Sequence, residues 1–219
     1  MSTRYTLIAG TRDWSSWSLR PYLALRHIGV PFGEEVVPLR RETTSPELLK
    51  YSPTGRVPVL KIDEGGQSYS VWDSLAICET LAERHAEAKL WPDDVKTRAI
   101  ARAYAAEMHS GFPDLRQQLS MDFVRRHPTP VLRDETKTQI ARIVAAWGEA
   151  LDQYAGDGGF LFGRFSVADC MYGPVVSRFV TYGIEVPTQA HSYMERMMAL
   201  PAMLDWGQAS QAEVDAGRA

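Results

Sequence analysis

The chain has 219 residues, of which 45% are hydrophobic and 23% are charged, and its formal net charge is −3 at pH 7. These values are typical of globular proteins, and the length allows one domain or two small ones. The slightly negative charge argues against nucleic acid or an anionic membrane surface as the main partner. No apolar run approaches the roughly 20 residues of a membrane span, and the N-terminus lacks the basic-then-apolar pattern of a secretion signal. We therefore expect a cytoplasmic protein.

The two cysteines, Cys78 and Cys170, are far apart in the sequence. They form no C-x-x-C pair, no metal cluster and no disulfide framework. Both lie inside helical patterns, so we expect them in the core, and we expect no metal site.

The first 85 residues alternate between strand and helix patterns. Four stretches have the composition of strands: 4–10, 32–39, 57–62 and 67–71. Three helical patterns accompany them: 18–29, a short helix that begins at Ser45-Pro46, and 73–85. The last two strands are joined by a hairpin turn and must run antiparallel. The order βαβαββα therefore predicts an α/β layer with a mixed four-stranded sheet.

Beyond a polar segment at 87–95 we find no strand pattern. Apolar residues three and four apart predict one long helix through Ile100, Tyr104, Met108, Phe112, Leu115 and Leu119. A second helix is predicted by Ile140, Val144, Trp147, Leu151 and Tyr154. Ser166 and Asp169 form a capping box that starts a third, and two more are expected at 188–199 and 201–213. The second half is thus predicted to be all-α.

Three serines, Ser15, Ser16 and Ser18, stand between the first strand and the first helix. Hydroxyls beside the free N–H groups of a helix start suit an anion. Proline is tolerated in the first turn of a helix, so Pro21 places the cap at about Ser18. Ser15 and Ser16 would then be free to serve a ligand. The alternative is that all three serines only cap the helix and turn the chain.

Four motifs, in the same order and over nearly the whole chain, resemble those of the cytosolic glutathione transferase superfamily. They are Ser15-Ser16-Trp17-Ser18-Leu19-Arg20, similar to the serine motif of the zeta-like and related bacterial classes; residues 52–60, similar to N-P-x-G-K-V-P-x-L; residues 73–77, similar to E-S-x-A-I; and residues 163–169, similar to the capping-box segment of the helical domain. The resemblance implies a thioredoxin-like domain at 1–86, a linker at 87–95 and a helical bundle domain at 96–219. It also implies glutathione as co-substrate and a homodimer.

The resemblance implies that the serine motif holds the sulfur of glutathione as a thiolate, which is the reactive form. A serine hydroxyl cannot remove the proton, but a hydrogen bond to an anion is worth roughly 1.5–3 kcal/mol. One serine could thus lower the thiol pKa from about 8.5 by one to two units. The motif favours Ser15 as the principal donor, with Ser16 close behind. Trp17 replaces a cysteine that accompanies maleylacetoacetate isomerisation in the zeta class; it either packs the loop or contacts glutathione and the acceptor.

The resemblance assigns the other groups of glutathione to further residues. Ser74, on the first turn of a helix, would bind the γ-glutamyl carboxylate, and Asp73 would bind the ammonium group or simply cap the helix. Val57 would pair its backbone with the cysteinyl residue next to a cis bond to Pro58. The glycyl carboxylate is assigned to Arg56, which holds the family's lysine position. Arg41 is a second candidate that could equally belong to a solvated face.

The acceptor site of this architecture lies between the domains. Residues 107–112 resemble a segment of bacterial members, and a glycine inside a helix costs up to about 1 kcal/mol, so something there needs the room. We expect His109 to contact a polar acceptor group or glutathione; the alternative is a structural histidine. The other acceptor candidates are Met108, Phe112, Arg116 and Tyr172.

The leading hypothesis is a glutathione transferase that adds the thiolate to an apolar or aromatic electrophile. A glutathione-dependent isomerase is the alternative among enzymes. A non-catalytic binding module of the same fold would have lost its glutathione contacts, whereas these motifs look complete. Aromatic and apolar walls suit many electrophiles, so the sequence does not identify the acceptor.

Overall fold

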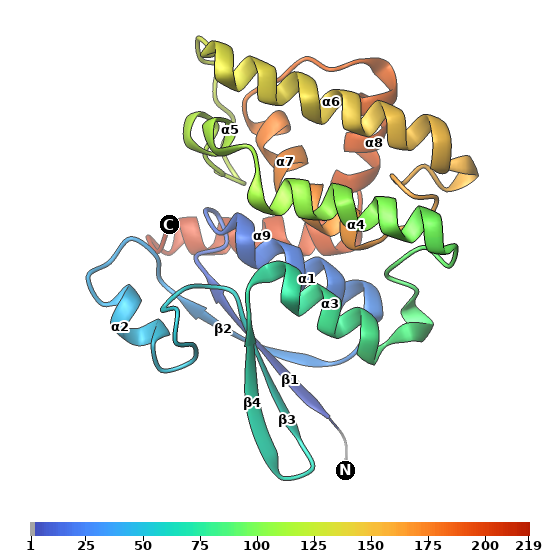
Figure 1. The fold of residues 1–219 in the computed structure, drawn as a ribbon. Coiled ribbons are helices and arrows are strands. Elements are labelled where there is room, and N and C mark those ends of the chain that lie inside the picture. The colour runs from blue at the N-terminus through green and yellow to red at the C-terminus, as the bar shows by residue number, and fades with distance from the viewer. Residues whose placement is uncertain (1–2) are drawn as a thin grey trace.

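The computed structural model describes residues 3–219, in which a four-stranded sheet is joined to a bundle of helices (Figure 1). The strand order is β2-β1-β3-β4. β1 (Arg4–Gly10) is parallel to β2 (Phe32–Val37) and antiparallel to β3 (Val59–Glu64), which is antiparallel to β4 (Gln67–Trp72). With α1 (Ser16–Ile28), α2 (Thr44–Leu48) and α3 (Ser74–Arg84), these strands form a thioredoxin-like domain. The predicted mixed sheet is confirmed.

Different helices cover the two faces of the sheet, because side chains alternate along each strand. Leu7 of β1 and Leu60 of β3 join the core cluster that contains α1 and α3. Their neighbours Ile8 and Val59 point the other way and pack with Leu48 of α2. The central strands β1 and β3 are therefore covered on both faces, whereas the edge strands β2 and β4 are largely exposed.

The second half of the described chain is helical, as predicted. Its elements are α4 (Val95–Ser110), α5 (Pro113–Gln118), α6 (Asp134–Tyr154), α7 (Val167–Thr181), α8 (Thr188–Met198) and α9 (Pro201–Asp215), with short 3-10 turns at Ala86–Ala88 and Gly156–Gly158. Within residues 3–219, no helix combines the length and the hydropathy that crossing a membrane requires.

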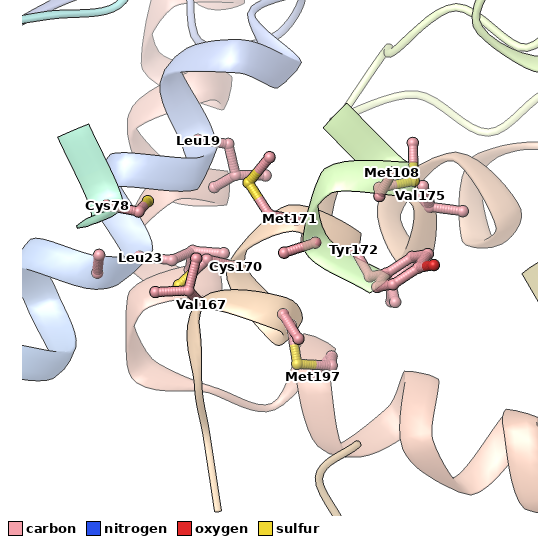
Figure 2. Packing of buried hydrophobic residues seen from close by; sticks show 14 of the residues in the cluster. Leu19, Leu23, Cys78, Met108, Val167, Cys170, Met171, Tyr172, Val175 and Met197 are labelled. Carbon is pink, nitrogen blue, oxygen red and sulfur yellow. The ribbon is translucent and has the colours of Figure 1, made fainter. Parts of the chain in front are cut away.

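The two halves share one core through α1 and α7. Leu19 and Leu23 of α1 lie among Cys170 and Met171 of α7, all of them almost completely buried (Figure 2). A Cβ atom at Gly173 would lie only 2.8 Å from Leu23 Cδ1, so the helices come this close because that residue is glycine. The start of α1 is thus anchored in the helical half.

The prediction of one helix from 100 to 119 is wrong, because the chain breaks between α4 and α5. Phe112 has a φ of 62°, and Pro113 starts α5. A residue before proline is disfavoured in the helical region, and the Arg116 guanidinium donates to the carbonyl of Gly111 at 3.1 Å. Gly111 therefore ends a helix instead of standing inside one. The apolar positions still face the core, which is why the spacing resembled one continuous helix.

Candidate active site

A cleft with a volume of about 640 Å³ lies where α1, the turn before β3 and the start of α3 meet. It is lined by Trp17, Thr54, Arg56, Val57, Pro58, Trp72, Asp73 and Ser74. Residues from three separate sequence motifs therefore line the same cleft.

Ser15, and not Ser18, caps α1. The Ser15 Oγ accepts the Ser18 N–H at 3.4 Å, and the Ser15 carbonyl accepts the Leu19 N–H at 3.2 Å. The Ser15 hydroxyl donates to Ser18 Oγ at 2.7 Å, and that oxygen also accepts the Gly10 N–H at 3.1 Å. The prediction from Pro21 was wrong because this proline lies in the second turn, where the helix forgoes one backbone hydrogen bond.

The first turn of α1 keeps unused hydrogen-bond donors. Ser16 is 4% exposed, and within residues 3–219 neither its hydroxyl nor the Trp17 N–H has a hydrogen-bond partner. The Ser15 hydroxyl lies beside them at the cap. Neither serine is among the residues that line the cleft, whereas Trp17 is. An anion at this turn would also meet the positive end of the helix dipole.

The loop between β1 and α1 is held by the helical half. The carboxylate of Asp13, which is buried, accepts the Val124 N–H at 3.0 Å. Arg12 pairs with Glu213 of α9 at 2.6 Å, and Trp206 Nε1 donates to the Arg12 carbonyl at 3.1 Å. The serine motif is therefore positioned by both halves of the chain.

Asp73 and Ser74 present a carboxylate and a hydroxyl at the start of α3. Asp73 Oδ1 accepts the N–H groups of Leu75 and Ala76 at 2.9 and 3.2 Å, while Oδ2 lies 3.2 Å from His109 Nε2 of α4. The φ of Asp73 is 76°, a strain of about 1–3 kcal/mol that proteins keep mainly at functional sites. Ser74 is 0% exposed yet lies at the wall of the cleft. The capping role of Asp73 and its place at the cleft thus coexist.

The turn before β3 supplies the opposite wall. The Val57–Pro58 bond is cis. β3 begins at Val59, two residues later than predicted, because Pro58 has no N–H for the ladder. Arg56 is exposed and has no ion-pair partner within residues 3–219, so its guanidinium is open to solvent. Arg41 is also exposed but does not line the cleft.

Two family models match the chain: the glutathione S-transferase N-terminal domain over residues 14–84 and the glutathione S-transferase C-terminal domain over residues 99–208. The chain belongs to the glutathione S-transferase family. It is 30% identical over 177 residues to the maleylacetoacetate isomerase of Pseudomonas aeruginosa, covering 79% of this chain and 80% of that protein. It is 30% identical over 161 residues to a zeta-class glutathione S-transferase of Euphorbia esula, covering 72% and 66% of the two.

A solved structure of maleylacetoacetate isomerase from Anaeromyxobacter dehalogenans also matches, with a TM-score of 0.69 and 26% identity over 94% of each chain. That structure has dicarboxyethyl glutathione and citrate bound in its active site.

Trp17 packs against the helical half of the chain and lines the cleft as well. Its ring lies 4.2 Å from Arg20 Cζ and 4.8 Å from Arg116 Cζ, and its edge meets the His109 ring with centroids 5.3 Å apart. Each cation–π contact contributes about 0.5–2 kcal/mol. Both roles considered for Trp17 from the sequence are therefore compatible with its position.

The predicted acceptor residues differ in how close they lie to the cleft. Met108 and Phe112 are 1% and 6% exposed, and Tyr172 is 0% exposed and packs on Trp147 in the core. Tyr172 therefore does not reach the cleft, and we leave it out of the proposed site. Arg116 is occupied with carbonyls at the end of α4, among them His109 at 3.3 Å. His109 meets two cleft residues, Asp73 and Trp17, and the Arg116 guanidinium meets Trp17.

Thr54 and Trp72 also line the cleft, and neither was predicted from the sequence. Trp72 is 43% exposed at the end of β4, directly before Asp73. The sequence did contain a signal for Trp72, because it is a large aromatic residue directly before the Asp73-Ser74 motif. Cys78 and Cys170 are both buried and free, which confirms that they belong to the core.

His109 leads to a prediction about pH. Burial lowers the pKa of His109 below its ordinary 6.5; Asp73 opposes this effect, and Arg20 and Arg116 add to it. The unfolded chain therefore takes up this proton at higher pH than the folded protein, so stability falls as pH drops from 6.5 through the folded pKa. We expect the wild type to lose more stability between pH 7 and 5 than His109→Gln. Urea unfolding of both proteins at each pH measures the difference, and parallel curves would contradict it.

Proposed function

We propose that this chain binds glutathione in the cleft and converts its thiol into a thiolate that attacks an electrophilic carbon. The observation that carries the proposal is that the cleft gathers the groups that glutathione needs. Asp73 and Ser74 suit the γ-glutamyl ammonium and carboxylate, the Val57 backbone suits the cysteinyl residue, and Arg56 suits the glycyl carboxylate. The serine turn of α1 directly precedes Trp17, which lines the cleft, while the serines themselves lie just behind it in the chain and are not among the lining residues. The relative crystallised with dicarboxyethyl glutathione supports this assignment.

The sulfur needs stabilisation more than it needs a base. A free thiol with a pKa of about 8.5 is only a few per cent ionised at pH 7. One hydroxyl donor and the start of α1 would together bring it to a pKa of roughly 6–7. In the transfer step the sulfur lone pair forms the new S–C bond, and the acceptor either expels a leaving group or takes up a proton. We propose Ser15 as the main donor, with Ser16 beside it.

An isomerase is the second candidate, because the Pseudomonas aeruginosa relative is a maleylacetoacetate isomerase. Trp17 stands where the zeta motif has cysteine, which weighs against this reaction without excluding it. The two activities differ in their use of glutathione: an isomerase regenerates it, whereas a transferase consumes one molecule per turnover. Counting free thiols during turnover of maleylacetoacetate and of an aryl halide separates them.

The experiment that tests the proposal is a titration with reduced glutathione, followed by the ultraviolet absorbance of the bound thiolate against pH. We expect a bound thiol pKa at least one unit below that of free glutathione. Binding without this change would indicate a non-catalytic module of the same fold. Absence of binding would refute the assignment of the cleft.

A further inference from the structure

Arg20 is a buried charge that lies over the Trp17 ring but has few polar partners. Its side chain, one turn into α1, is 0% exposed. Its Nη1 donates to Ser74 Oγ at 3.3 Å, while Nε and Nη2 are buried and have no hydrogen-bond partner within residues 3–219. No carboxylate in that range forms an ion pair with it. A buried charge left this poorly paired ordinarily destabilises a fold.

The charges around Arg20 are mostly of the same sign. The groups that face it from the surrounding helices are Arg116 of α5, Arg178 of α7, His109 of α4, and Asp73 and Cys78 at α3. Burial lowers the pKa of Arg20 well below its ordinary value, and Arg116 and Arg178 lower it further. A guanidinium nevertheless stays protonated in proteins. At the inner end of the cleft the positive charges of Arg20, Arg116 and Arg178 therefore outnumber the Asp73 carboxylate that faces Arg20.

We propose that Arg20 is a positioning residue for glutathione, acting on the bound molecule through Ser74 and through its own buried charge. Because Ser74 Oγ accepts a hydrogen bond from Arg20, the Ser74 hydroxyl proton is left to donate into the cleft. The γ-glutamyl carboxylate would accept it there. The excess of positive charge also favours every anionic group of the ligand, including the thiolate, because buried charges are only weakly screened. This inference rests on the proposed function.

The test is Arg20→Met, which keeps the volume of the side chain and removes its charge. We expect the Kd for reduced glutathione to rise about tenfold, as for one lost hydrogen bond to a charged group. We expect the bound thiol pKa to rise by about half a unit. The poorly paired buried charge disappears together with its cation–π contact to Trp17, so the melting temperature should change little. Arg26→Met is the matched control: it removes the same charge from the exposed side of α1 and should leave the Kd and the thiol pKa unchanged.

The double variant Arg20→Met/Ser74→Ala separates the effect that Arg20 exerts through Ser74 from the direct effect of its charge. If Arg20 orients Ser74, its effect on Kd shrinks in the Ser74→Ala background, whereas its effect on the thiol pKa persists. A lowered melting temperature with wild-type Kd and thiol pKa would show a purely structural role and overturn the inference. A wild type that fails to bind glutathione would instead overturn the proposed function.

If Arg20→Met does not fold, Arg20→Lys is measured in its place. Its ammonium keeps the charge but lacks the planar fork of the guanidinium. We expect weaker binding of glutathione with a nearly unchanged thiol pKa. A wild-type Kd in Arg20→Lys would contradict the role of Arg20 in orienting Ser74.

Discussion

Replacing Asp169 with alanine will lower the free energy of unfolding by about 3–5 kcal/mol, because several buried donors lose their acceptor. One oxygen of this fully buried carboxylate accepts the Ser166 N–H and the Ser166 hydroxyl, both at 2.9 Å. The other accepts the Leu161 N–H and the Tyr193 hydroxyl, both at 3.2 Å. Asp169 thus ties the start of α7 to the preceding loop and to α8. Urea unfolding at pH 7 measures the loss.

The effect should also depend on pH in a defined direction. Burial raises the pKa of Asp169 to about 6, against the hydrogen bonds from Leu161 and Ser166 that lower it. The folded protein therefore binds this proton at a higher pH than the unfolded chain does. As pH falls below 6, the contribution of Asp169 to the free energy of unfolding therefore grows. Asp152→Ala is the control, because Asp152 is exposed and, within residues 3–219, its side chain bonds only that of Gln189. We expect a change within about 0.5 kcal/mol. Equal losses in both variants would contradict a special role for Asp169.

The contacts of Asp169 show which interactions can be predicted from the sequence and which cannot. The spacing of Ser166 and Asp169 predicts the capping box, since both partners lie within one helical turn. The same reasoning cannot find the bond from Tyr193, because that residue comes from another helix and its approach depends on tertiary packing. Strand and helix order in the first half was predictable for the same reason: each element has its own local period.

The errors lie where tertiary contacts override a local rule. Pro21 was placed in a first turn, but the bonds of Ser15 and Ser18 to each other and to Gly10 start the helix three residues earlier. Likewise the break at Phe112 is hidden by apolar residues that keep a helical spacing on both sides of it. At the site, the motifs select the right cleft residues, whereas the contacts of His109 with Asp73 and of Arg20 with Ser74 join distant segments. No pattern in a single sequence reports such pairs.

Replacing Ser15 with alanine will raise the pKa of the bound glutathione thiol by about one to two units, because the thiolate loses a charge-assisted hydrogen bond. The Ser15 hydroxyl now donates to Ser18 Oγ, a neutral acceptor. If the Ser15 hydroxyl donates to the thiolate instead, its hydrogen bond to a neutral oxygen is replaced by a charge-assisted one that is roughly twice as strong. From a wild-type bound pKa of roughly 6–7, the thiolate fraction at pH 7, and with it kcat/KM for transfer, should fall by about two- to fiftyfold. Thiolate absorbance of the complex against pH measures the pKa directly.

Ser16→Ala is the matched comparison, because it removes a neighbouring hydroxyl that does not cap the helix. We expect it to change the thiol pKa by less than about half a unit and to leave stability unchanged. Ser15→Ala, in contrast, should also cost about 0.5–2 kcal/mol of unfolding free energy through the lost cap. The two readouts separate the roles, because a residue that only caps would change stability without moving the thiol pKa. If Ser16→Ala raises the pKa and Ser15→Ala does not, then Ser16, whose hydroxyl has no partner within residues 3–219, holds the thiolate and Ser15 only starts the helix.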